Sequence, residues 1–235
     1  MRLDALLTRL GVGTRSQCQR MIRSGQVTVG GMPVRDPSCT TRSGAQITVN
    51  GHTLDTRLER TYMLYKPEGV LTAAADKKAR TVMDLMPPAC MTLSCMPVGR
   101  LDKDTTGLLL LSTDGELAHR LISPRYEINK VYQALSDTPF TEDDVRAFAD
   151  GLELSDFKAR PALLEITEPF SALITVSEGK YHQVRRMLAS RGHKTLALHR
   201  LKIGPLSLDP TLEPGQNREL DENELSALRK AVNLP

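Results

Sequence analysis

The 235-residue sequence lacks several features that would set its location or class. It has no tryptophan, and aromatic residues make up only 4% of the chain. Its longest apolar runs, such as residues 108–111, span four residues, whereas a membrane-spanning helix needs about 20. The first nine residues are interrupted by charges and lack the apolar core of a signal peptide. We therefore expect a cytoplasmic protein without a membrane span.

Cysteine is also scarce and unpatterned. The four cysteines are Cys18, Cys39, Cys90 and Cys95, none of them at C-x-x-C spacing and none near a histidine at zinc spacing. No glycine-rich nucleotide-binding loop is present either. The sequence therefore predicts free thiols in a reducing compartment, no metal site and no cofactor.

Charge is distributed unevenly along the chain. The formal net charge is only +3, but residues 1–60 contain nine arginines, no lysine and four acidic residues. A positive end on a nearly neutral body indicates an anionic partner, and arginine favours phosphate because its planar fork matches phosphate geometry. A solvated surface without a partner is the alternative.

The first sixty residues read as a unit of their own. Leucines at positions 3, 6, 7 and 10 share one helical face that ends at Gly11, and Thr14 begins a second helix with a capping box to Gln17. Short alternating segments around residues 27–29 and 47–49 predict a small sheet over the helix pair. Residues 52–61 are expected to be a polar linker.

These features resemble the S4 RNA-binding module, from Arg2-Leu3-Asp4 through Thr14-Arg15 and Gly25 to Val27-Thr28-Val29. The sequence departs from the family at Gly30, where S4 modules usually have asparagine. The resemblance implies that the polar side of the second helix contacts the RNA backbone. The residues expected to bind RNA are Arg2, Arg9, Arg15, Gln19, Arg20 and Arg23.

The remainder of the chain alternates short strands with helices in an irregular order, which favours an α+β fold over a regular βαβ array. Residues 108–111 predict a buried strand, and helices are expected near residues 114–121, 145–149, 183–191 and from Asp221 onward. The most informative segment directly precedes the buried strand and reads Gly99-Arg-Leu-Asp-Lys-Asp-Thr-Thr-Gly107. Taken alone, Asp-x-Asp before two hydroxyl residues is more typical of a turn than of an active site.

Three further motifs decide between these interpretations. They are Tyr65-Lys-Pro-Glu-Gly69, Lys130-Val-Tyr132 and Ser177-Glu-Gly-Lys-Tyr-His-Gln-Val-Arg-Arg-Met187. Together with residues 99–107 they resemble, in order, the motifs of pseudouridine synthases, although Tyr65 replaces the usual asparagine. The resemblance implies a catalytic domain with a mixed, mainly antiparallel sheet flanked by helices, at residues 59–235, after an S4 domain at 1–58.

The resemblance also assigns roles to individual residues. Asp102 matches the catalytic aspartate, Arg185 its guanidinium partner, Tyr132 the aromatic residue that stacks on the target base, and Arg100 an arginine near the flipped nucleotide. The reaction breaks the N1–C1′ bond of uridine and joins C5 to C1′. It therefore requires a carboxylate, which aspartate supplies at neutral pH, and neither a redox cofactor nor a metal.

Tyr181-His182 and the chain length resemble the type that modifies one uridine of 16S ribosomal RNA, in a partly assembled small subunit. We expect a monomer. A relative acting on 23S ribosomal RNA and a catalytically silent RNA-binding protein are the alternatives. A glycosidase using Asp102 and Asp104 is a third interpretation, but it gives no reason for the S4-like module.

Overall fold

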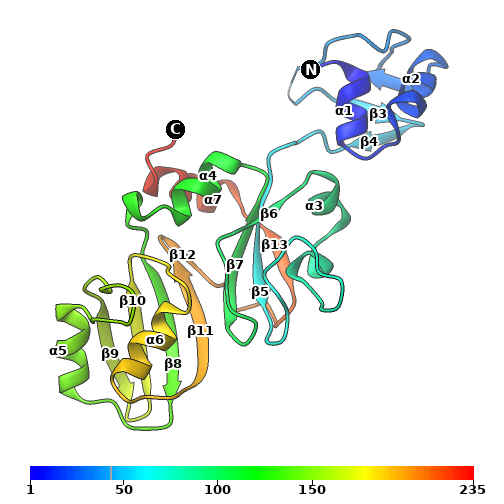
Figure 1. Cartoon of the computed structure of the whole chain (residues 1–235). Coiled ribbons are helices and arrows are strands. Elements are labelled where there is room, and N and C mark those ends of the chain that lie inside the picture. The colour runs from blue at the N-terminus through cyan, green and yellow to red at the C-terminus, as the bar shows by residue number, and fades with distance from the viewer. Residues whose placement is uncertain (43) are drawn as a thin grey trace. The chain divides into compact units, whose positions relative to one another are not determined.

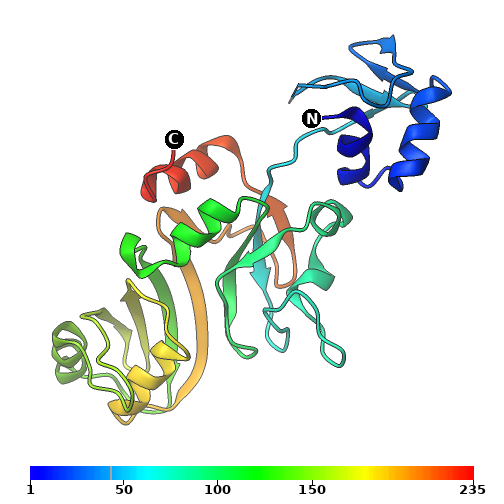
Figure 2. The ribbon, with the colours of Figure 1, turned by 45° about the horizontal axis from the view of Figure 1, so that its top comes forward.

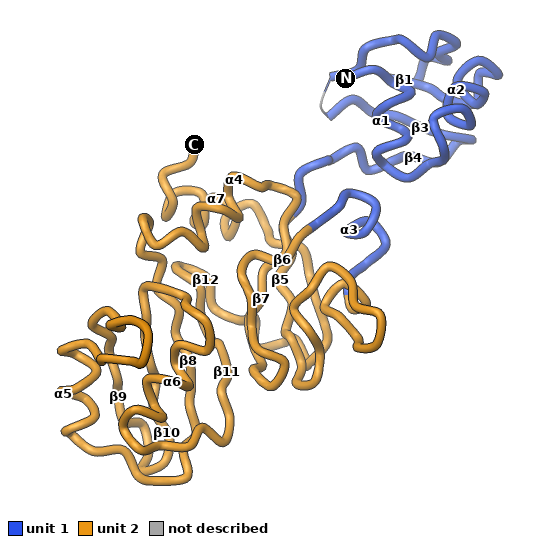
Figure 3. Tube along the Cα trace, viewed as in Figure 1, with its two compact units in different colours: residues 1–60, 86–95 blue, residues 61–85, 96–235 orange. Residues whose placement is uncertain are grey.

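The computed structural model describes residues 1–42 and 44–235, which form two compact units (Figure 3). Unit 1 comprises residues 1–60 and 86–95, and unit 2 comprises residues 61–85 and 96–235. Each unit has its own apolar core. None of the helices within the described residues is long and apolar enough to cross a membrane.

Unit 1 combines short helices with a four-stranded antiparallel sheet in the order β2-β1-β3-β4. Its elements are α1 (Leu3–Arg9), α2 (Arg15–Arg23), β1 (Val27–Val29), β2 (Met32–Pro33), β3 (Ile47–Val49), β4 (His52–Leu54) and α3 (Pro88–Thr92). The predicted capping box is confirmed, because the Thr14 side chain accepts from the Gln17 amide and Gln17 accepts from the Thr14 amide. Leu3, Leu7 and Ile22 are fully buried between the helices and the sheet.

The linker expected at residues 52–61 is wrong in its first part, since His52–Leu54 form strand β4. The reason lies in the preceding turn. Asn50 and Gly51 both have positive φ, at 51° and 81°, as the two central residues of a type I′ hairpin turn require. The chain therefore returns along β3 and extends the sheet before it leaves unit 1.

Unit 2 is built on a nine-stranded sheet, in the order β13-β5-β7-β11-β8-β10-β9, with β6 paired to β7 and β12 paired to β11 (Figure 1). Its strands are β5 (Thr61–Lys66), β6 (Met96–Val98), β7 (Thr106–Ser112), β8 (Lys130–Ser136), β9 (Leu163–Glu168), β10 (Ser171–Val176), β11 (Thr195–Ile203), β12 (Leu206–Ser207) and β13 (Asn217–Glu219). The helices are α4 (Gly115–Ile122), α5 (Glu142–Asp150), α6 (Gln183–Ser190) and α7 (Glu222–Ala231), with 3-10 turns at Val82–Leu85 and Pro124–Tyr126.

The sheet is mixed and mainly antiparallel, as predicted. Its parallel pairing joins β7 to β11, where His199 lies opposite Thr106 and Arg200 opposite Gly107. At this point the two backbones approach closely: a Cβ on Gly107 would lie 2.3 Å from the Arg200 carbonyl oxygen. Gly107 therefore brings the strand that follows the Asp102 segment against the strand that carries Arg200.

The helices of unit 2 cover the sheet in two places. Helices α4 and α7 lie side by side in both Figure 1 and Figure 2. Leu117 and Leu121 of α4 and Leu228 of α7 share a core cluster with Leu108 and Leu110 of β7. Helix α6 lies across the β8–β11 part of the sheet, and its Val184, Met187 and Leu188 are buried.

Candidate active site and RNA-binding surface

A pocket of about 110 Å³, open to solvent, lies in unit 2 and is lined by residues from three of the four predicted motifs, the exception being Tyr65–Gly69. Its lining includes Arg100, Asp102, Lys130, Tyr132, Glu178, His182, Arg185 and Arg200. The sequence-predicted site residues of the second unit therefore lie around one cavity. They come from the loop before β7, from β8, from the loop after β10 and from α6.

The loop that carries Asp102 is held by the segment that follows β5. The Lys66 Nζ is buried and donates to the carbonyl oxygens of Pro67 (3.0 Å), Lys103 (3.2 Å) and Thr105 (2.8 Å). The Gly69 amide also donates to the Lys103 carbonyl, at 2.8 Å. Burial lowers the pKa of Lys66 to about 8, although Asp104 and Asp102 oppose this shift. The Tyr65–Gly69 motif thus holds the Asp102 loop through hydrogen bonds from Lys66 and Gly69. These bonds explain why the motif contains a lysine.

The Asp102 carboxylate is accessible and has two basic neighbours. Its side chain is 26% exposed. Oδ2 lies 3.8 Å from Nε of Arg185, and Oδ1 lies 3.3 Å from Nε2 of His182. The Arg185 Nε is buried and makes no hydrogen bond within the described residues, so its contact with Asp102 is an ion pair without a hydrogen bond. The carboxylate therefore has a basic side chain next to each oxygen and remains open to the pocket.

Asp104 contacts the same arginine more closely than Asp102 does. Its Oδ2 lies 3.0 Å from Nη2 of Arg185, and its side chain is 58% exposed. The local pattern favours Asp104 as a turn residue, and the ion pair with Arg185 adds a second contact to that loop. One guanidinium therefore bridges the two carboxylates of the Asp-x-Asp segment, with the less exposed one facing the pocket.

The segment between β10 and α6 is shaped by Glu178 and Gln183. Glu178 Oε1 accepts from Nε2 of Gln183 at 2.7 Å and from the Arg160 amide at 2.9 Å, and Gln183 Oε1 accepts from the Lys180 amide at 3.0 Å. His182 closes the turn with a left-handed φ of 48°. These hydrogen bonds fix the turn before α6, so that the helix begins at Gln183 and Arg185 faces the Asp102 loop.

Tyr132 lies on β8 opposite Arg200 of β11, so that both side chains leave the same face of the sheet. Tyr132 is 9% exposed and its hydroxyl accepts from Nη1 of Arg200 at 3.3 Å. Arg200 is buried and also donates from Nε to the Leu108 carbonyl at 2.8 Å. The ring of Tyr132 is therefore fixed at one wall of the pocket.

Arg200 is not among the residues predicted from the sequence, and Lys66 received no separate role there. Arg200 stands in Leu198-His-Arg-Leu-Lys-Ile203, where strand alternation places it on the same face as buried Leu198. An arginine at an inward position of an apolar strand is the signal that could have identified it. Arg100, by contrast, is exposed and its side chain makes no hydrogen bond or ion pair within residues 1–42 and 44–235.

In unit 1, three of the predicted RNA-binding side chains converge on one carboxylate. Asp4 is fully buried and accepts from Nε of Arg2 (3.0 Å), Nε of Arg15 (3.2 Å) and Nε2 of Gln19 (2.8 Å). The hydrogen bonds from Arg2 and Gln19 hold the pKa of Asp4 well below its usual range. The two arginine side chains remain 48% and 61% exposed, so each is anchored by Nε and still faces solvent.

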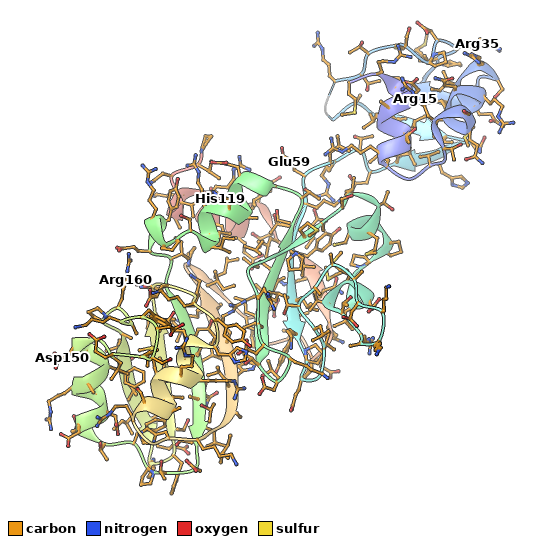
Figure 4. All side chains as sticks on the ribbon, in the orientation of Figure 1. Arg15, Arg35, Glu59, His119, Asp150 and Arg160 are labelled. Atoms are coloured by element: carbon orange, nitrogen blue, oxygen red, sulfur yellow. The ribbon has the colours of Figure 1, made fainter. Side chains whose placement is uncertain are left out.

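The other predicted contacts of this surface differ in character. Arg9, Arg20 and Arg23 are exposed, and their side chains make no hydrogen bond or ion pair within the described part of the chain. Figure 4 shows the side chains of unit 1, with Arg15 and Arg35 labelled. The surface thus combines two anchored arginines with three that are free to adapt, an arrangement suited to a phosphate backbone.

Comparison with known families matches both units. Residues 60–190 match the RNA pseudouridylate synthase family, and residues 1–47 match the S4 domain.

Similar full-length proteins and a solved structure agree with these matches. An uncharacterized RNA pseudouridine synthase, YtzG, of Bacillus subtilis is 39% identical over 98% of this chain and 99% of its own length. Ribosomal small subunit pseudouridine synthase A of Escherichia coli is 37% identical over 97% of this chain and 100% of its own. The crystal structure of a pseudouridylate synthase covers 97% of this chain and 99% of its own, with 35% identity and a TM-score of 0.69.

Proposed function

The chain belongs to the RNA pseudouridylate synthase family, and we propose that it converts one uridine of 16S ribosomal RNA, uridine 516, to pseudouridine. It is a pseudouridine synthase that acts on ribosomal RNA. We assign residues 1–58 to RNA docking and residues 59–235 to catalysis. The small-subunit substrate is supported by two relatives named for that subunit, from Vibrio cholerae and Escherichia coli, each 37% identical.

Asp102 is the proposed catalytic residue. The observation that carries this assignment is a partly exposed carboxylate that lines the pocket, 3.8 Å from Arg185 and 3.3 Å from His182. Such a group can attack the nucleoside or take a proton from it while the two basic neighbours hold it in place. Asp104 is the weaker candidate because it is 58% exposed.

The target base must leave its helix to reach the pocket, at a cost of a few kcal/mol. Tyr132 then offers one face of its ring for stacking, and we assign Arg100, which is exposed and lines the pocket, to the neighbouring backbone. The bond between N1 and C1′ breaks, the base turns, and C5 joins C1′. The hydrogen at C5 is lost to solvent and N1 gains a proton, so the product is an isomer of the substrate and no cofactor is consumed.

The test is release of tritium from uridine labelled at C5 in 16S ribosomal RNA, free or in partly assembled subunits. We expect release by the wild-type chain and none by Asp102→Asn. Asp104→Asn, which changes the other carboxylate beside Arg185, is the matched variant and should retain most of the activity. Equal loss in the two variants would overturn the assignment of Asp102.

Mapping pseudouridine in ribosomal RNA from cells without this protein tests the substrate. We expect one uridine of 16S RNA to remain unmodified, and re-expression of the wild-type chain to restore it. A missing modification in 23S RNA would instead support the alternative substrate. An unchanged map together with no tritium release would indicate a catalytically silent RNA-binding protein.

A further inference from the structure

Two buried cations line the pocket beside Tyr132 without an acidic partner. Lys130 is 8% exposed and Arg200 is 3% exposed. The Lys130 Nζ donates to the Ile128 carbonyl at 2.9 Å. The Arg200 Nη2 is buried and has no hydrogen-bond partner within the residues described. In that same part of the chain, no carboxylate oxygen lies within 4.0 Å of either cation.

This arrangement is unfavourable for a protein that only has to fold. Buried charges are normally paired, and two like charges in one cavity repel each other. The pKa of Lys130 reflects this, because burial and the charge of Arg200 lower it to about 8. The Lys130–Arg200 pair is therefore best explained by a negative charge that arrives with the substrate.

The proposed reaction produces such a charge on the base by every route open to Asp102. If Asp102 attacks C1′, the N1–C1′ bonding electrons leave with the base as a uracil monoanion. If Asp102 removes a proton from the sugar, elimination expels the same anion. If it adds to C6 of the base, the charge moves onto the O4 oxygen as an enolate.

Resting on the proposed function, we infer that Lys130 and Arg200 stabilise the negative charge that develops on the uracil base while it is separated from C1′. Electrostatic groups that are already in place when charge develops give large rate effects. The charge disappears again when C5 bonds to C1′, C5 loses its proton and N1 is protonated. The pair is thus matched to the transition state rather than to the neutral substrate base.

The alternative anion is a phosphate of the flipped nucleotide. The burial of both cations argues against it, because a phosphate is hydrated and lies on the outside of the nucleic acid. Exposed Arg100 is better placed for that contact. The two possibilities predict different losses: a phosphate contact supports affinity, whereas stabilisation of the base anion supports the rate of the bound complex.

The experiment measures single-turnover tritium release and RNA affinity for Lys130→Met. We expect the rate of the bound complex to fall about 100-fold with the dissociation constant changed less than about threefold. Lys202→Met is the matched control, since Lys202 is an exposed lysine on β11, outside the pocket, and should behave as wild type. Arg200→Met should show the same split, and circular dichroism checks that it folds; if it does not, Lys130→Met carries the test alone.

A pH profile separates a charge effect from a packing effect. The titratable or charged groups that line the pocket with Lys130 are Arg100, Asp102, Tyr132, Glu178, Lys180, His182, Arg185 and Arg200. Because these are common to both proteins, the ratio of wild-type to Lys130→Met rates isolates Lys130. The ratio should be large at neutral pH and fall toward one as the pH rises through about 8, where the ammonium loses its proton.

The outcomes distinguish this inference from the proposed function. An inactive wild-type protein would contradict the proposed function itself. An active wild type with an unaltered Lys130→Met rate, a pH-independent ratio, or a loss confined to RNA affinity would overturn the role of the pair and leave the proposed function standing.

Discussion

Arginine serves two different purposes in the two units, and the difference lies in the partner that each unit supplies. In unit 1, Arg2 and Arg15 are anchored by a buried carboxylate, Asp4, and their outer faces remain exposed. In unit 2, Arg200 is itself buried beside Lys130, and no acid lies within 4.0 Å of either in the described residues. The first arrangement is electrostatically satisfied before RNA binds, and the second is not.

The comparison separates docking from chemistry. A surface that binds many phosphates gains from cations that are already neutralised on one side and hydrated on the other, because little has to be rearranged on binding. A site that stabilises a transient anion gains from cations whose field is not cancelled by a neighbour. Mutations in the arginine surface of unit 1 should therefore change the affinity for RNA. Mutations of the buried cations of unit 2 should change the rate of the bound complex.

Gly107→Ala should have the largest effect, and we expect it to disable the catalytic site of unit 2 without changing the RNA surface of unit 1. A Cβ at this position would lie 2.3 Å from the Arg200 carbonyl oxygen, and φ is +105°. Strain and overpacking together should cost about 3 kcal/mol or more and displace Arg200. We expect loss of activity and a lower unfolding temperature, with the salt dependence of RNA binding retained.

Gly115→Ala is the control for this change, because a Cβ added there would have no neighbouring atom within 4 Å and the residue's φ is not positive. It should leave activity and the unfolding temperature near the wild-type values. Full activity in Gly107→Ala would show that the β7–β11 approach does not set the site.

Lys66→Met should have the next largest effect. It removes two hydrogen bonds to the backbone of the segment that carries Asp102, at Lys103 and Thr105, and a third to Pro67, while every residue that lines the pocket keeps its identity. We expect the rate of tritium release to fall roughly 10- to 100-fold, as misplacement of a catalytic group costs about that much. RNA affinity should be unchanged. The exposed Lys103→Met provides the comparison, and an equal effect of both would argue against support of the loop by Lys66.

These residues also show what the sequence could and could not predict. The capping box at Thr14, the buried strand at residues 108–111 and the mixed sheet were accessible, because each depends on local pattern or on the family resemblance. The strand at His52–Leu54 was missed because its polar residues conceal a pairing that the preceding turn imposes. The hydrogen bonds of Lys66 and Arg200 join segments that are 39 and 92 residues apart, so the local sequence around either residue could not predict these partners.

Replacing Arg9, Arg20 and Arg23 by glutamine tests the RNA surface of unit 1 while leaving unit 2 unchanged. Removing one arginine–phosphate interaction should reduce the slope of log affinity against log salt by about 0.7–0.9 units, so up to about 2–3 units for all three. The rate at saturating RNA should stay within about twofold of wild type. Lys130→Met should show the opposite result, a lower rate at saturating RNA with an unaltered salt slope of RNA affinity. A triple variant with the wild-type slope would remove these arginines from the RNA surface.

Asp4→Asn should have the smallest effect on function, and it tests whether anchoring matters. The carboxyl has a lower pKa in the folded chain than in the unfolded chain, so its contribution to stability is complete above the ordinary aspartate pKa of about 3.9 and is lost as the pH falls further. Calorimetry of the intact protein from about pH 6 down to about pH 2.5 should therefore show a steeper acid loss in wild type than in Asp4→Asn.

At neutral pH the same variant should bind RNA only a few-fold more weakly, because Arg2 and Arg15 keep their charges and lose only their fixed orientation. Asp36→Asn is the matched control: Asp36 is an exposed aspartate of unit 1 whose carboxylate accepts hydrogen bonds from Ser38 and acts on Arg2 only through its charge, without a hydrogen bond. If Asp4→Asn abolished binding, the carboxylate would be essential to the RNA surface. If it bound as tightly as wild type, anchoring would serve the stability of unit 1 alone, and the contrast with the unpaired cations of unit 2 would rest on the rate measurements.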